Sequence, residues 1–110
     1  MKIDSSYVGY EATSGRYACY YLAKIWESNL DQDKAFHYYQ RAVGFSEEIK
    51  ALESGYYHYS LFGLARIYDK RGDQKEAEKC LKTIRKNTKR KNEVNKRARE
   101  YMKSLKRDGG

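Results

Sequence analysis

The sequence predicts an all-α protein built from short pairs of helices, and three observations favour this class. The chain has 110 residues and no proline, so the commonest helix breaker is absent. Apolar residues recur at intervals of three and four along most of the chain, which places them on one face of a helix. A pattern of small and large apolar residues also occurs twice, with a partial third copy near the C-terminus. A chain of this length forms one domain at most.

The first predicted helix covers residues 16–29. Its apolar residues recur at helical spacing and are Cys19, Leu22, Ala23, Trp26 and Leu30. Residues 1–15 are expected to form a loose or short-helical lead-in, because Ser, Thr and Gly interrupt the periodicity there.

The second predicted helix begins at the acidic run 31–33, since a carboxylate can accept hydrogen bonds from the free amides of a first turn. Its inward positions keep steps of three and four and are Ala35, Tyr38, Ala42, Phe45, Ile49 and Leu52. This spacing favours one helix as far as about Glu53. The alternative is a new helix at Ser46, because Gly44 costs about 1 kcal/mol relative to alanine. Ser54 and Gly55 mark the end of the region.

Three further helices are predicted. Residues 57–70 form the first, ended by Gly72, and residues 74–86 form the second, with a favourable charge pair between Glu78 and Lys82. Residues 92–106 form the last, whose narrow apolar stripe consists of Val94, Ala98, Tyr101 and Leu105. Residues 107–110 are expected to form a disordered tail.

The repeated pattern joins these helices in pairs. One copy reads Leu61-x-x-Leu64-Ala65-x-x-Tyr68, then Ala77-x-x-x-Leu81. The other reads Cys19-x-x-Leu22-Ala23-x-x-Trp26, then Ala35-x-x-x-Tyr39, and the last helix repeats the first half as Val94-x-x-Arg97-Ala98-x-x-Tyr101. This arrangement resembles the tetratricopeptide (TPR) repeat, in which small residues let two helices approach and aromatic residues fill the gap to the next pair.

The resemblance implies an α-solenoid domain over residues 16–106. It would contain two TPR-like repeats, about 16–53 and about 57–87, and a capping helix at about 92–106. The offset between the repeats is 42 residues, whereas the family period is about 34. A solenoid usually needs about three repeats for stability. We therefore expect exposed apolar and tyrosine surface on the first pair, and either self-association or a place at the C-terminal end of a longer array.

The resemblance also implies a function, because TPR proteins bind peptides or protein surfaces on the concave face lined by the first helix of each pair. Carried over residue by residue, that face contains Tyr17, Tyr20, Lys24, Glu27, Tyr59, Phe62, Arg66, Lys70, Asn95, Arg99 and Lys103. Such a groove suits a peptide with acidic or carboxylate groups, since arginine binds carboxylates through paired hydrogen bonds and tyrosine offers rigid contact area. The alternative interpretation is that these aromatic residues pack between the repeats.

The charge distribution supports a second hypothesis, nucleic-acid binding. The net charge of +8 is concentrated in residues 79–107, which hold 13 Lys/Arg and 2 Asp/Glu. Such a segment could follow a phosphate backbone. Its single aromatic residue, Tyr101, offers no platform for stacked bases, so a solvated basic face is the simpler interpretation.

No group of residues indicates catalysis or a cofactor. His37 and His58 lie in different predicted helices, without an Asp or Cys at the spacing of a triad or a metal site. Cys19 and Cys80 are expected to be buried free thiols. We therefore predict a protein that is not an enzyme and has no cofactor. The sequence contains no apparent membrane span or signal peptide, which makes the cytoplasm the default location.

Overall fold

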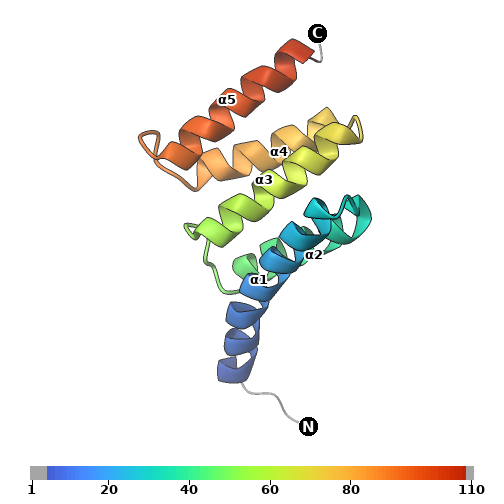
Figure 1. Ribbon diagram of the computed structural model, residues 1–110. Helices are drawn as coiled ribbons and strands as arrows, with labels where there is room; N and C mark the ends of the chain where they lie inside the picture. The colour runs from blue at the N-terminus through green and yellow to red at the C-terminus, as the bar shows by residue number, and fades with distance from the viewer. Residues whose placement is uncertain (1–4, 109–110) are drawn as a thin grey trace. The chain divides into compact units, whose positions relative to one another are not determined.

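A computed structural model describes residues 5–108, with side chains described from Ala12 to Lys106. Within this range the protein consists of five α-helices and has no strand. The helices are α1 (Ser5–Ser28), α2 (Gln32–Glu48), α3 (Gly55–Lys70), α4 (Gln74–Lys86) and α5 (Glu93–Asp108) (Figure 1). The predicted all-α class is confirmed.

The chain divides into two compact units. The N-terminal unit ends at Ser60 and contains α1, α2 and the beginning of α3. The C-terminal unit begins at Leu61 and contains the rest of α3 together with α4 and α5.

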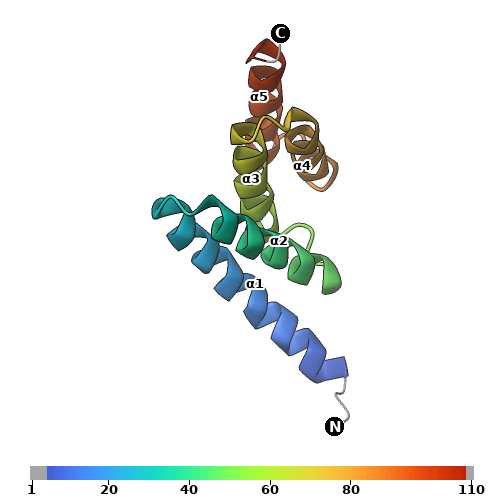
Figure 2. The same cartoon turned by 90° about the vertical axis from the view of Figure 1, so that its right-hand side faces the viewer.

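In the N-terminal unit, α2 runs back along α1 (Figure 2). The core between them consists largely of small residues, because Ala12, Ala23, Ala35 and Ala42 are all buried. At the far end of the pair, a Cβ atom on Gly15 would lie 2.8 Å from Cε2 of Phe45. This close approach explains why a glycine stands inside α1.

The beginning of α1 corrects one expectation. Residues 5–15 are helical and continuous with the rest of α1, so this stretch is not a loose lead-in; residues 1–4 lie outside the described range. Local propensity is poor here, but tertiary packing supplies most of the stability of a helix in a protein. Buried Ala12, and Gly15 beneath the Phe45 ring, provide that packing.

The end of α2 corrects a second expectation. The helix stops at Glu48 rather than continuing to about Glu53. Lys50 adopts the left-handed conformation, with φ of 57°. The amide of Lys50 then donates to the Glu47 carbonyl at 3.1 Å, and the amide of Ala51 donates to the Ser46 carbonyl at 2.8 Å. This pair of bonds is the Schellman motif, which satisfies carbonyls at a helix end and here overrides the apolar periodicity.

Two leucines of the first predicted helix also lie differently from expectation. Leu22 is exposed, and Leu30 is 88% exposed because it follows α1 in a left-handed turn with φ of 63°. Tyr21 and Ile25 are exposed on the same helix. The expected apolar and tyrosine surface on the first helix pair is therefore confirmed, while self-association stays a prediction.

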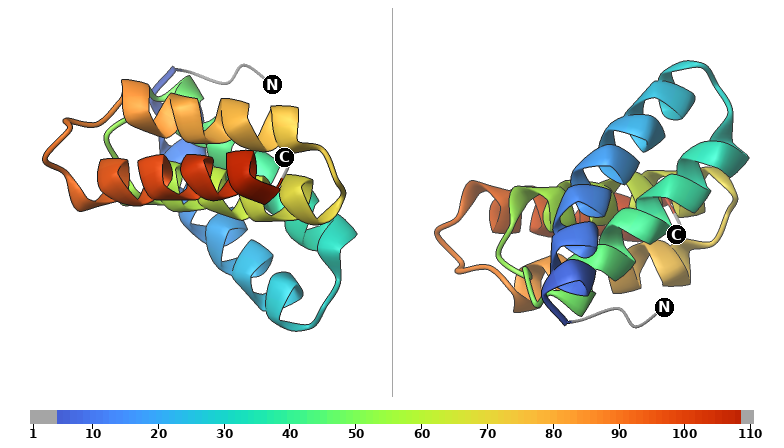
Figure 3. Two further views of the ribbon diagram at one scale, coloured as in Figure 1. Left: turned by 90° about the horizontal axis from the view of Figure 1, so that it is seen from above. Right: turned by 90° about the horizontal axis from the view of Figure 1, so that it is seen from below.

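In the C-terminal unit, α4 runs back along α3, and α5 runs back along α4 (Figures 1 and 3). Leu64, Ala65, Ala77, Leu81 and Ala98 are buried, as the repeated pattern predicts. The expected charge pair of α4 is also present, since Nζ of Lys82 lies 3.3 Å from Oε1 of Glu78. The last helix continues to Asp108, so residues 107 and 108 are not part of a disordered tail.

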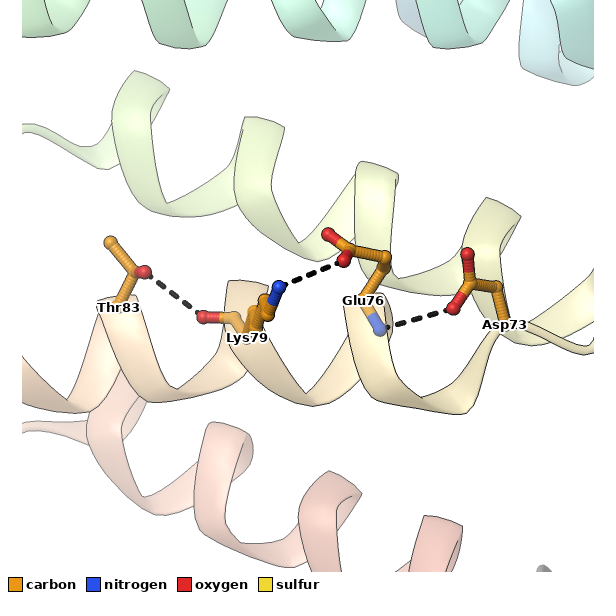
Figure 4. A network of polar contacts seen from close by, with 4 residues as sticks. All are labelled: Asp73, Glu76, Lys79 and Thr83. Carbon is orange, nitrogen blue, oxygen red and sulfur yellow. Dashed lines mark hydrogen bonds and ion pairs between the residues drawn. The ribbon is translucent and has the colours of Figure 1, made fainter.

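Polar contacts fix the beginning and the outer face of α4 (Figure 4). Oδ1 of Asp73 accepts a hydrogen bond from the Glu76 amide at 3.3 Å, which caps the helix. Nζ of Lys79 then donates to Oε1 of Glu76 at 3.0 Å, and the hydroxyl of Thr83 donates to the Lys79 carbonyl at 2.9 Å. Asp31 caps α2 in the same way, accepting from the Lys34 amide at 3.1 Å.

Candidate binding sites

Each unit contains a hollow to which residues of the predicted groove contribute. Tyr17, Tyr20 and Tyr59 line a hollow in the N-terminal unit, and Asn95 and Arg99 line one in the C-terminal unit. The structure therefore brings five of the eleven predicted residues together, as two sets with different chemistry.

The first hollow, here called the tyrosine hollow, has a volume of about 450 Å³. Its lining comes from α1 and from the beginning of α3, and consists of Arg16, Tyr17, Tyr20, Tyr21, Ser54, Gly55, Tyr56 and Tyr59. Tyr56 packs against three of the other four tyrosine rings. Its ring centroid is 4.4 Å from that of Tyr17, 5.5 Å from that of Tyr20 and 6.1 Å from that of Tyr21, all in edge-to-face arrangements, a geometry that aromatic pairs prefer.

Arg16 is held in the wall of this hollow. Nη1 donates to the Ser54 hydroxyl oxygen at 2.9 Å, and Nη2 donates to the Tyr17 hydroxyl oxygen at 2.9 Å. Its guanidinium carbon also lies 4.7 Å from the centroid of the Tyr17 ring. The Ser54 oxygen accepts a second hydrogen bond from the Tyr56 amide at 3.2 Å. One serine thus links the arginine to the start of α3.

The tyrosine hollow stays uncharged apart from Arg16. The hydroxyls of Tyr21 and Tyr56 share a hydrogen bond of 3.5 Å. That bond, followed by burial and by the neighbouring hydroxyls of Tyr21 and Tyr17, raises the pKa of Tyr56, while Arg16 opposes the shift. Tyr56 is therefore a neutral phenol at physiological pH. Among the described residues no carboxylate lines the hollow.

Two other predicted residues of this unit lie outside the hollow. Lys24 is exposed on α1, and Glu27 accepts a hydrogen bond from the buried Tyr39 hydroxyl at 2.6 Å. Glu27 therefore links α1 to α2 through a hydrogen bond within the unit, and does not line the hollow.

The second hollow, here called the basic hollow, has a volume of about 480 Å³. It lies where α4 ends and α5 begins, and is lined by Lys82, Arg85, Lys86, Thr88, Arg90, Asn95 and Arg99. Five of these side chains are cationic, and none of the described lining residues is acidic. The arrangement favours a ligand with more than one negative charge.

Buried Asn95 organises this hollow. Its Nδ2 donates to the carbonyls of Arg85 and Thr88 at 3.3 and 3.2 Å, and to the Thr88 hydroxyl at 3.1 Å. Its Oδ1 accepts from Nε of Arg99 at 2.9 Å. Arg99 donates again from Nη2 to the Arg90 carbonyl at 3.2 Å. Asn95 thus connects the end of α4, the following loop and α5.

The remaining predicted residues of the C-terminal unit line neither hollow. Phe62 is buried, and the guanidinium carbon of Arg97 lies 5.4 Å from its ring centroid. This agrees with the alternative interpretation that some of the aromatic residues pack. Lys70 and Lys103 are exposed and Arg66 is half-buried. Arg66 lies near Tyr101, whose pKa is raised to about 12 by burial and by Asp69, against the opposing charge of Arg66.

Sequence reasoning missed several lining residues. Tyr21 and Tyr56 do not occupy family groove positions, although the chain's 12 tyrosines signalled an unusual use of this residue. Arg85, Lys86 and Arg90 belong to the basic segment, but charge counting alone gave no reason to expect them around one hollow.

Other reactive groups are buried. Burial lowers the pKa of His58, while a contact with the Glu53 backbone and the charge of Glu53 oppose the shift. Burial raises the pKa of both free thiols, that of Cys80 to about 11. In the described part of the chain, no three His, Cys, Asp or Glu residues gather as metal ligands. Nor does any described helix combine the length and apolarity needed to cross a membrane.

No family model matches this chain, and no solved structure matches it.

Proposed function

We propose that this chain is a non-catalytic binding module of TPR-like helical hairpins, which binds a peptide or a partner protein surface. Support for the TPR-like part comes from buried alanines at the pattern positions. Ala23, Ala35, Ala65, Ala77 and Ala98 all have 0% exposure. Residues of this size let helix axes approach closely, as the family's packing requires.

The tyrosine hollow is the observation on which the proposed function rests. It presents five tyrosine rings beside one immobilised arginine. Tyrosine gives a large contact area at low cost in side-chain entropy, because it has only two side-chain torsions. The rings are already fixed by one another and by Arg16, so little further ordering opposes binding.

The chemistry of the hollow selects the kind of peptide. Tyr17 and Tyr59 are partly exposed and can stack against an apolar or aromatic side chain. Arg16 uses two of its five N–H donors within the protein, and its charge favours a carboxylate nearby. We therefore propose a peptide with an apolar residue close to an acidic side chain or a free C-terminal carboxylate.

Selection from a random peptide library against the whole chain tests this proposal. Peptides with an aromatic or aliphatic residue near a carboxylate are expected to be enriched. The double variant Tyr17→Ala/Tyr59→Ala should weaken their binding by about tenfold or more, as loss of an aromatic anchor does. Tyr38→Ala is the matched control, since Tyr38 belongs to the same unit but does not line the hollow. Recovery of no peptide, or equal losses in both variants, would refute the proposal.

A further inference from the structure

We propose that the basic hollow is a separate binding site for a compact ligand that carries two or more phosphate groups. The proposal is independent of the peptide site, because the two hollows share no residue. It rests on the convergence of charge, on the fixed geometry of the lining and on the size of the hollow.

The cations come from three successive parts of the chain. Lys82, Arg85 and Lys86 lie on α4, Arg90 lies in the connection, and Arg99 lies on α5. Only Lys82 has a described carboxylate partner, Glu78, which lies outside the lining. Like charges gathered in one concave surface repel one another and focus a positive potential. A bound polyanion would relieve that repulsion.

Part of the lining, namely Thr88, Asn95 and Arg99, is held in place before any ligand arrives. Asn95 fixes Arg99 through its Oδ1 atom, and Arg99 also donates to the Arg90 carbonyl. The hydroxyl of Thr88 donates to the Ile84 carbonyl at 2.7 Å while accepting from Asn95. Side chains fixed in this way lose less entropy when a ligand binds. Arg85 and Arg90 are exposed residues, and their guanidinium forks can bind phosphate oxygens in pairs. Nη1 of Arg85 contacts only the weak acceptor Sδ of Met102, at 4.0 Å, among the described residues.

The choice of ligand follows from the number of cationic side chains and from the volume of the hollow. A phosphate monoester carries about −1.5 to −2 charges at neutral pH, so two or three phosphate groups balance five cations. The volume of about 480 Å³ falls within the usual range for small-molecule sites, about 300–1,000 Å³. No aromatic ring lines the hollow, so it offers stacked bases no platform. Clustered phosphates on a small carrier fit these features better than a nucleic-acid strand.

Calorimetric titration of the whole chain with tripolyphosphate and with inositol hexakisphosphate tests the site. Both probes are expected to bind at physiological ionic strength. Arg85→Gln/Arg90→Gln should weaken binding by about tenfold or more, since charge-assisted hydrogen bonds are lost. Lys75→Gln/Lys96→Gln removes the same net charge from α4 and α5 outside the hollow, and should weaken binding by less than about threefold, the loss expected from distant screened charges.

Two further variants keep the test decisive. Arg85→Lys/Arg90→Lys retains the charge but loses the forks, so binding intermediate between the parent and the glutamine variant is expected. If the arginine variants fail to fold by circular dichroism, the single changes Lys86→Gln and Lys75→Gln make the same comparison, because only Lys86 lines the hollow.

The source of the phosphates is distinguished in parallel. Additional binding to vesicles that contain phosphatidylinositol 4,5-bisphosphate would identify a lipid headgroup, and binding to the soluble probes alone would identify a free polyphosphate. Both results support the site. Absence of binding, equal losses in the two double variants, or tighter binding of a short RNA duplex that both variants weaken equally would overturn the proposal.

Discussion

The tyrosine hollow and the basic hollow are nearly equal in volume, about 450 and 480 Å³, yet their chemistry is opposite. The first has five phenol rings and one cation, and the second has five cations and no ring. The first lies between α1 and the start of α3, and the second lies between the end of α4 and the start of α5. The comparison teaches that the helical framework supplies a concave surface in each unit, while the exposed side chains decide what that surface can bind.

The two linings are also stabilised differently. Ring contacts dominate in the tyrosine hollow, where Ser54 supplies a hydrogen-bonded link between the start of α3 and Arg16. In the basic hollow a buried amide, Asn95, bonds to three other residues. Apolar contacts tolerate small displacements, whereas a buried amide has few alternative partners. The basic hollow should therefore depend more strongly on a single residue.

The largest expected effect is that of Asn95→Ala. It removes the bonds to the Arg85 and Thr88 carbonyls and frees Arg99. Leaving buried polar groups without partners costs about 1–3 kcal/mol, so we expect the free energy of unfolding to fall by about 2–3 kcal/mol. Chemical denaturation measures this change.

Ser54→Ala provides the comparison in the other unit. It removes a helix-capping oxygen and the partner of Arg16, and loss of a cap typically costs about 1 kcal/mol. A loss of stability from Ser54→Ala that equals or exceeds that from Asn95→Ala would show that the two hollows depend equally on single polar residues.

A smaller effect is expected at alkaline pH, where the two buried thiols should contribute differently to the loss of stability. Burial raises the pKa of Cys80 from 9.0 to about 11. Between these values the unfolded thiol loses its proton and the folded thiol keeps it. The unfolded state then binds fewer protons, so stability falls as the pH rises. One pKa unit corresponds to 1.36 kcal/mol. Near pH 11, where the folded thiol is itself half ionised, the loss of stability attributable to Cys80 is about 2 kcal/mol.

Cys19 should contribute less, because Arg41 opposes the effect of burial on its pKa. Urea unfolding below pH 9 and near pH 11 compares the parent with Cys80→Ala and Cys19→Ala. Cys80→Ala should reduce the fall in the free energy of unfolding between these two pH values more than Cys19→Ala does. A larger effect of Cys19→Ala would contradict the inference that the Cys80 thiol has the more strongly raised pKa.

The features that local sequence could predict are those set by neighbouring residues. The boundaries of α4 followed from the turn at Gly72 and the spacing of Ala77 and Leu81, since a turn and an apolar stripe are local features of one helix. The continuous helix over residues 5–15 was not predicted, and a described long-range contact within it joins Gly15 to Phe45, which lies 30 residues further along the chain. Such a contact leaves no local signal.

The candidate sites were predictable only in part, for the same reason. Tyr17, Tyr20 and Tyr59 were found at family positions, but Tyr56 was missed although its ring packs against three others. Its role depends on how the start of α3 meets α1, and periodicity does not contain that information. Asn95 was assigned to a groove, whereas its burial and bonds make it the organiser of the basic hollow.

The smallest expected effects concern the turns that follow α1, α2 and α3. In each turn one residue has positive φ: Leu30 at 63°, Lys50 at 57° and Gly72 at 80°. Only the turn of the C-terminal unit uses glycine. A left-handed conformation costs an ordinary residue about 1–2 kcal/mol, whereas glycine adopts it freely. Both turns of the N-terminal unit are therefore strained in a way that a glycine would relieve.

Leu30→Gly tests this difference directly. Leu30 is exposed, so its removal sacrifices little packing, and we expect a gain of about 1 kcal/mol after the greater freedom of glycine in the unfolded chain is subtracted. Gly72→Ala is the matched reverse change, because a Cβ atom there meets nothing within 4 Å, and it should cost about 1 kcal/mol through backbone strain alone. Thermal unfolding of both variants measures the two effects. If Leu30→Gly destabilises the protein, contacts of the Leu30 side chain compensate for the backbone strain of its turn. The proposed difference in turn strain between the two units would then be wrong.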